Sequence, residues 1–187
     1  MVWHDHWNLK GKHAYLGASK WNWINYDEDH LVTSYSNFEA IQRGTELHAL
    51  AEMCIKNHVK LRGSRTTLAM YVNDAIGYHM SPEQILYYSD NCFGTADSIC
   101  FRDGFLRIHD LKTGVTPAHI EQLMIYEALF CLEYGHDPFD IQSELRIYQN
   151  DEITACNPEA DDIKSIMDKI VQFDKIISGI KLSESEA

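Results

Sequence analysis

Apolar residues recur at intervals of three and four over long stretches of the chain, which is the spacing of amphipathic helices. This pattern predicts helices over residues 43–61, 66–80, 117–135 and 158–180. Thr45 stands at the expected N-cap of the first helix. Pro117 and Gly135 mark the expected start and end of the third.

A second pattern separates these helices and consists of short runs rich in aromatic and β-branched residues, which are typical of strands. Such runs cover residues 85–89, 92–101, 105–112 and 140–149. Asp103-Gly104 lies between the second and third runs and is a strong signal for a two-residue hairpin turn. The order of elements predicts one α/β domain over residues 1–187, with an antiparallel hairpin at the centre of its sheet.

The two ends of the chain lack a clear period. Residues 1–40 are rich in aromatic side chains and predict an irregular extension, with a short helix over 17–24 that Ser19 would cap. Residues 181–187 predict a disordered tail.

The hairpin turn determines which residues face each other across the central strands. With Asp103-Gly104 as the turn, apolar residues pair on one face, and Asp97 faces Asp110 at the open end. Directly opposed residues have Cβ atoms about 4.5–5.5 Å apart, and like charges there are destabilising. A divalent cation removes that penalty, and carboxylate oxygens suit Mg²⁺ or Mn²⁺. The spacing therefore predicts a metal site, although a three-residue turn would break this register.

Lys112 extends the face of Asp110 by one further step along the strand. An acid and a base at a strand end usually form a solvated ion pair. Here the acid already faces a second acid, so we expect the Lys112 ammonium to contact a scissile phosphate or a metal-activated water rather than Asp110.

Two of the predicted helices carry polar pairs at i, i+4 spacing, which places each pair on one helix face. His48 and Glu52 are candidate metal ligands, of which Glu52 has mere surface charge as an equal alternative. Gln122 and Tyr126 suit contacts to phosphate or bases. Taken alone, each pair is better explained by a structural role. The placement of both pairs around the hairpin favours a single functional site.

The formal net charge of −12 argues against a protein that holds nucleic acid by overall attraction. One stretch without acids gathers four basic residues: Lys56, Lys60, Arg62 and Arg65. A phosphate-binding surface would therefore be local. The five cysteines show no zinc spacing, which favours reduced thiols in a cytoplasmic protein. No apolar run reaches the roughly 18 residues of a membrane span, so no membrane partner is expected.

Four short motifs follow one another along the chain: "GTELH" with His48, "GTAD" with Asp97, "DLK" with Asp110 and Lys112, and "QLMIY" with Gln122 and Tyr126. Together they resemble the PD-(D/E)XK nuclease superfamily, in particular its RecB-like branch of viral exonucleases and CRISPR adaptation nucleases. "LGASK" at residues 16–20 is similar to the serine-containing N-terminal motif of that branch. The resemblance spans roughly residues 16–150 and implies a restriction-endonuclease-like core of helix, three antiparallel strands, helix and strand, with additional helices.

The resemblance also implies roles for single residues. The metal ligands would be His48, Asp97, Asp110 and the backbone carbonyl of Leu111. Lys112 would be the catalytic lysine, and Gln122 and Tyr126 would line the substrate groove. Iron–sulfur members of the branch carry a cysteine before the histidine motif and three near the C-terminus. This chain has no cysteine before His48, so no iron–sulfur cluster is expected.

The expected function is a metal-dependent DNA nuclease that uses Mg²⁺ or Mn²⁺, most simply an exonuclease in recombination, repair or viral DNA processing. The basic stretch would guide the backbone of linear DNA ends, and Tyr126 would stack on bases. Because the chain is acidic, a homo-oligomer or a recombination partner protein would aid binding. The alternatives are a structure-specific endonuclease, a nuclease acting on RNA, and a non-catalytic nucleic-acid- or protein-binding module on the same fold.

Overall fold

The computed structural model describes residues 7, 14–62 and 65–185. The chain forms two compact units, residues 1–45 and 46–187. Helix α1 (Glu28–Lys56) includes residues of both units. No helix within the described residues combines the length and the apolarity that a membrane crossing requires.

The first unit contains the 3₁₀ helix η2 (Ala18–Asn25) and the first part of α1. The short helix predicted here is confirmed, but Gly17 rather than Ser19 occupies the N-cap. Asp27 caps α1 by accepting a hydrogen bond from the backbone amide of His30 at 2.8 Å. Part of the predicted irregular extension is therefore helical; its residues 1–6 and 8–13 lie outside the described part of the chain.

Thr45 lies inside α1 rather than at its start, and its hydroxyl donates a hydrogen bond to the carbonyl of Ile41. The N-cap prediction was wrong because residues 28–42 are helical without a continuous buried stripe. Leu31, Val32 and Ile41 are all exposed, so burial imposes no helical period on this stretch.

The second unit is built on a five-stranded mixed sheet in the order β1-β2-β3-β4-β5. The strands are β1 (Ser81–Ser89), β2 (Cys92–Arg102), β3 (Phe105–Leu111), β4 (Gln142–Gln149) and β5 (Glu152–Cys156). Strands β3 and β4 run parallel, and the other neighbours run antiparallel. The predicted α/β class and the central antiparallel hairpin are confirmed.

Asp103 and Gly104 both have positive φ angles, 51° and 76°, as a two-residue turn of the type I′ family requires. The resulting β2–β3 register pairs Arg102 with Phe105 and continues to Ser98 opposite His109. This register is the predicted one, so the turn residues alone determined which side chains face each other.

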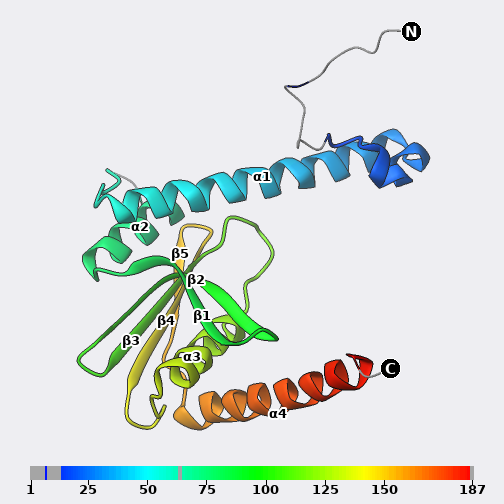
Figure 1. The fold of residues 1–187 in the computed structure, drawn as a ribbon. Coiled ribbons are helices and arrows are strands. Elements are labelled where there is room, and N and C mark those ends of the chain that lie inside the picture. Colours follow the sequence, from blue (N-terminus) through cyan, green and yellow to red (C-terminus); the bar gives the residue numbers. More distant parts are fainter. Residues whose placement is uncertain (1–6, 8–13, 63–64, 186–187) are drawn as a thin grey trace. The chain divides into compact units, whose positions relative to one another are not determined.

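Helices cover both faces of the sheet in the second unit. One face packs on α2 (Thr67–Gly77) and on the last turns of α1, with Tyr71, Leu111 and Tyr148 in the shared core. The other face packs on α3 (Glu121–Tyr134) and α4 (Ala160–Ser185). Figure 1 shows α2 and α3 on opposite sides of the strands.

Several elements of the second unit differ from the sequence predictions in their extent, and one strand was not predicted. Strand β1 begins at Ser81 rather than at the predicted residue 85, and α3 begins at Glu121 rather than near Pro117. The acidic segment after β4 forms the exposed edge strand β5, which has too little buried apolar surface to show a pattern. Residues 181–185 continue α4 instead of forming a disordered tail, and residues 186–187 lie outside the described part.

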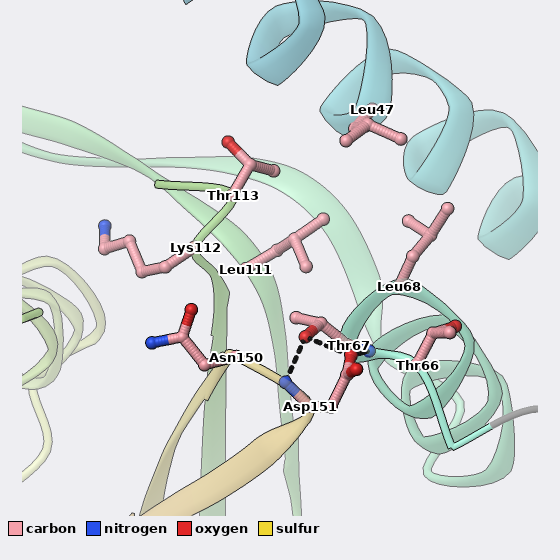
Figure 2. Close-up of a pocket in the computed structure, with 9 residues that line it drawn as sticks. All are labelled: Leu47, Thr66, Thr67, Leu68, Leu111, Lys112, Thr113, Asn150 and Asp151. Atoms are coloured by element: carbon pink, nitrogen blue, oxygen red, sulfur yellow. Dashed lines mark hydrogen bonds between the residues drawn. The ribbon is translucent and has the colours of Figure 1, made fainter. Parts of the chain in front are cut away.

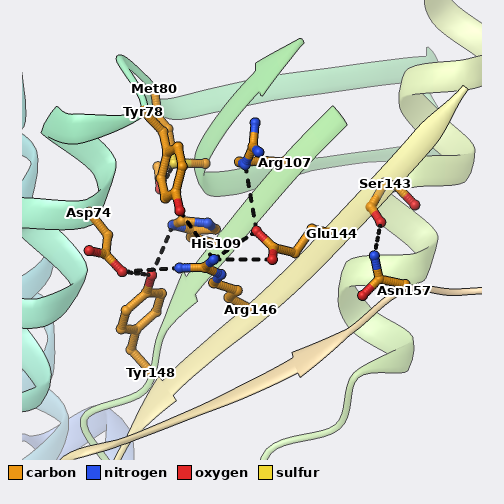
Figure 3. A network of polar contacts seen from close by, with 11 residues as sticks. Asp74, Tyr78, Met80, Arg107, His109, Ser143, Glu144, Arg146, Tyr148 and Asn157 are labelled. Atoms are coloured by element: carbon orange, nitrogen blue, oxygen red, sulfur yellow. Dashed lines mark hydrogen bonds and ion pairs between the residues drawn. The ribbon is translucent and has the colours of Figure 1, made fainter. Parts of the chain in front are cut away.

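A network of polar side chains ties α2 to the sheet, and Figure 3 shows it. We call it the α2 network; its members are Asp74, Tyr78, Arg107, His109, Glu144, Arg146 and Tyr148. Arg146 Nη1 lies 3.1 Å from Asp74 Oδ2, and Arg146 Nη2 lies 3.0 Å from Glu144 Oε1. Burial and the nearby Arg146 and Arg107 lower the pKa of His109 to about 3, so its imidazole is neutral in the folded protein.

One carboxyl group in α3 is buried and forms no ion pair within the described part of the chain. Glu127 is only 2% exposed, and its Oε2 atom has no hydrogen-bond partner. Burial raises the pKa of Glu127 to about 7, while a hydrogen bond with Ser143 opposes that shift.

Candidate functional site

Two carboxylates meet at the end of the β2–β3 hairpin, as the register predicts. Asp97 Oδ2 accepts a hydrogen bond from the backbone amide of Leu111 at 2.7 Å, which holds Asp97 beside the end of β3. Asp110 is 2% exposed, although acids are rarely buried so completely unless they are paired. Burial and the neighbouring Asp110 raise the pKa of Asp97 to about 6, while His48 and the Leu111 amide act in the opposite direction.

Lys112 connects this pair of acids to α3. Its Nζ atom lies 2.9 Å from Asp110 Oδ2, donates a hydrogen bond to Oδ1 at 3.1 Å, and donates another to Gln122 Oε1 at 2.9 Å. The Gln122 amide in turn donates to the hydroxyl of Tyr126 at 3.1 Å. The prediction that Lys112 would not pair with Asp110 was wrong, because the half-buried ammonium finds its nearest counter-charge there. Its contact with a phosphate or a metal-activated water stays a prediction.

Tyr126 is held at the site by close packing against β2. A Cβ atom on Gly94 would lie 2.8 Å from Tyr126 Cε1, a separation that real Cβ atoms essentially never show. Only glycine therefore lets the Tyr126 ring approach the strand this closely. We call Asp97, Asp110, Lys112, Gln122 and Tyr126 the site cluster.

His48 adjoins the cluster from α1, with its Nδ1 atom 3.5 Å from Asp97 Oδ2. A third potential ligand comes from β1, since one ligand atom each from His48, Glu83 and Asp97 lie within 4.8 Å of one another. Sequence reasoning missed Glu83. Burial raises its pKa, His48 lowers it, and Glu52 raises it.

Glu52 and the basic stretch contribute less than predicted to this arrangement. Glu52 forms an ion pair with Lys56 one turn further along α1 and is not part of the His48, Glu83 and Asp97 group. Lys56, Lys60, Arg62 and Arg65 have exposed side chains. Their role in binding DNA, like the role of the Leu111 carbonyl as a ligand, stays a prediction.

A pocket of about 220 Å³ lies beside Lys112 on the other side from α3, and Figure 2 shows its lining. Leu47, Leu68 and Leu111 form its apolar wall. Asp151 closes one side by accepting hydrogen bonds from the backbone amide and the hydroxyl of Thr67 at 2.7 and 3.0 Å. The first turn of α2 is thus capped by a protein carboxylate rather than left open to an anion.

The donor set at the hairpin end fits a divalent cation. Three carboxylates, from Glu83, Asp97 and Asp110, are accompanied by one lysine and the imidazole of His48. Oxygen ligands suit Mg²⁺ and Mn²⁺, and imidazole is compatible with the transition metals. A bound cation would relieve the repulsion that raises the pKa of Asp97.

Comparison of the chain with protein-family models, with curated proteins and with solved structures found no match. The geometry of the site and the motifs in the sequence are therefore the only indications of function.

Proposed function

We propose that the protein is a metal-dependent deoxyribonuclease, most simply an exonuclease, on a restriction-endonuclease-like core of the PD-(D/E)XK type. One observation carries the proposal: Asp97 and Asp110 lie together at a hairpin end with Lys112 held beside them by Gln122. Two neighbouring acids raise each other's free energy unless a cation or a proton separates them. Such an arrangement supports catalysis better than it supports stability.

His48, Asp97 and Asp110 would hold Mg²⁺ or Mn²⁺. When bound, the metal ion would lower the pKa of a coordinated water and screen charge on the phosphate. Asp97 is suited to ligation because its Oδ2 atom is fixed by the Leu111 amide at 2.7 Å. Asp110 is oriented by Lys112, so neither carboxylate has to be ordered when the ion arrives.

Lys112 would supply positive charge at the scissile phosphate. Its ammonium donates to both Asp110 and Gln122, and these two contacts fix its direction before the substrate binds. Gln122 and Tyr126 would position the phosphodiester backbone, because the amide and the phenol already form one hydrogen-bonded row with Lys112. The pocket beside Lys112 offers room for a nucleotide next to the cleaved bond (Figure 2).

The acidic chain requires help in binding DNA. With a net charge of −12, long-range repulsion opposes the approach of a polyanion. The exposed basic residues from Lys56 to Arg65 would give local attraction. A homo-oligomer that surrounds the substrate, or a recombination partner protein, would supply the remaining affinity for DNA.

The experiment compares linear DNA labelled at one end with closed circular DNA, each incubated with Mn²⁺, Mg²⁺ or chelator. The proteins are the wild type, Asp110→Asn, and Asp168→Asn as a control, since Asp168 forms an exposed ion pair on α4. We expect metal-dependent loss of linear DNA with the wild type and the control, and none with Asp110→Asn. Cleavage of closed circles would indicate an endonuclease. Absence of cleavage with every metal and with RNA would leave a non-catalytic binding module.

A further inference from the structure

We propose that Glu83 is a metal ligand, which acts with His48 and Asp97 to bind a divalent cation and to favour Mn²⁺ over Mg²⁺. The inference rests on the proposed function in so far as the ion is the one that the nuclease site would use. It adds a residue that no motif in the sequence indicates.

The three ligand residues come from three separate elements that the fold brings together. His48 lies in α1, Glu83 in β1 and Asp97 in β2, and their ligand atoms lie within 4.8 Å of one another. Ligands about 2.1–2.2 Å from one ion are separated by roughly 3–4.4 Å, depending on the angle between them. Small side-chain rotations would therefore complete the coordination.

The backbone of β1 departs from regular strand geometry at Glu83. Pro82 pairs with Ser98 and Gln84 pairs with Ala96, so the register is the same on both sides of Glu83. Glu83 itself has a φ of 51°, in the left-handed region that L-residues other than Gly, Asn and Asp rarely adopt. The register is undisturbed by this conformation, and it places Glu83 opposite Asp97 of β2.

The ligand types account for the preference between metals. Mg²⁺ favours oxygen ligands in near-ideal octahedral geometry and retains several waters. Adding the imidazole of His48 to two carboxylates favours transition metals, among which Mn²⁺ also tolerates carboxylate oxygen. Loss of Glu83 should therefore weaken Mn²⁺ binding, and loss of His48 should also reduce the preference for Mn²⁺.

Titration calorimetry of the full chain with MnCl₂ and with MgCl₂, without DNA, tests the proposal. We expect Glu83→Gln to weaken Mn²⁺ binding by about tenfold or more, in the range found when groups around a metal are removed. Asp90→Asn is the matched control, because Asp90 lies at the far end of β1 and contacts Tyr87. Its Mn²⁺ affinity should equal that of the wild type.

A second measurement uses the wild type alone and does not depend on the folding of a variant. Carbodiimide labelling of carboxylates, read by mass spectrometry, should show Glu83 protected when Mn²⁺ is added and Asp90 unchanged. Labelling of Glu83 that is indifferent to Mn²⁺ would overturn the proposal. So would a folded Glu83→Gln variant with wild-type affinity, or a wild type that does not bind Mn²⁺.

The outcomes separate this inference from the proposed function. Mn²⁺ binding through Glu83 without any cleavage of nucleic acid would sustain the ligand and refute the nuclease. Cleavage by the wild type together with unchanged Mn²⁺ binding in Glu83→Gln would refute the ligand role of Glu83 and sustain the nuclease.

Discussion

Strand β3 supplies alternate side chains to two polar groups, one on each face of the sheet. His109 and Arg107 point into the α2 network, whereas Asp110 belongs to the site cluster with α3. In the α2 network, two arginines are matched by two carboxylates, and His109 is neutral. Around the site cluster, three carboxylates gather near one lysine and His48.

Under the proposed function, this difference separates a structural polar group from a functional one on the same sheet. Balanced charges leave no net repulsion, so the α2 network holds a helix against the sheet at little electrostatic cost. Unbalanced charges destabilise the folded protein and persist where a ligand compensates them. Charge balance, rather than burial, therefore distinguishes the two clusters, since both contain fully buried acids or bases.

Among the substitutions considered, Asp97→Asn should have the largest effect. It removes a proposed metal ligand, so we expect DNA cleavage to fall by about a hundred- to a thousandfold, as when a group that stabilises the transition state is lost. It also removes one of two neighbouring negative charges. The same change should raise the free energy of unfolding of the metal-free protein by about 1 kcal/mol at pH 8. Cleavage rates and urea unfolding in chelator measure the two effects. A loss of both activity and stability would contradict this interpretation.

Arg146→Met, in the α2 network, should lower the stability of the protein and leave metal binding unchanged. It leaves Asp74 and Glu144 without their shared partner, and breaking a buried pair from one side is strongly destabilising. Because Arg146 is 18% exposed, we expect a moderate loss of about 2–3 kcal/mol in the free energy of unfolding. Urea unfolding measures it, and calorimetry with Mn²⁺ serves as the control. A changed metal affinity would show that the two faces are coupled.

Glu127→Gln would test what a buried acid costs where neither a cation nor a ligand compensates it. The pKa of Glu127 is raised from 4.5 to about 7, so the folded state disfavours the charged form. Its stabilising contribution is complete below pH 4.5 and is lost as the pH rises through 7. The variant should gain about 2 kcal/mol over the wild type at pH 8, and nothing at pH 4. A difference in the free energy of unfolding between variant and wild type that does not change with pH would refute this prediction.

Gly94→Ala should give the smallest effect and concerns the position of Tyr126. The added methyl group would force the ring away from β2. We expect a loss of about 1 kcal/mol in the free energy of unfolding and a rise in KM for DNA with little change in kcat. Gly135→Ala is not a suitable control because Gly135 has a positive φ of 70°. Gly77→Ala is suitable, because a Cβ atom at Gly77 would meet no atom within 4 Å. Steady-state kinetics with both variants checks the prediction.

Local chemistry explains why much of the second unit was predictable. Asp103 and Gly104 encode their own turn, and that turn sets the β2–β3 register and hence the Asp97–Asp110 pair. The end of α3 at Gly135, which adopts the left-handed conformation, was equally local. Such features depend on neighbouring residues in the sequence, so they can be predicted from the sequence alone.

The missed features depend on contacts between distant residues or on surfaces without a burial pattern. Glu83 is a ligand candidate only because the β1–β2 register places it opposite Asp97 and the fold brings His48 of α1 beside them. Strand β5 is nearly all exposed, so its apolar residues follow no core face. The direction of Lys112 depends on Gln122 in α3, which spacing along one strand cannot reveal.

The β2–β3 turn also affects the order in which the protein folds. A hairpin with a two-residue turn closes in about 1–10 μs, whereas parallel pairing of β3 with β4 must wait for the α3 crossover. Asp97 and Asp110 therefore approach each other before α3 brings Gln122 to Lys112. We expect the repulsion between the two acids to slow the earliest step of folding, so that divalent cations would accelerate folding itself.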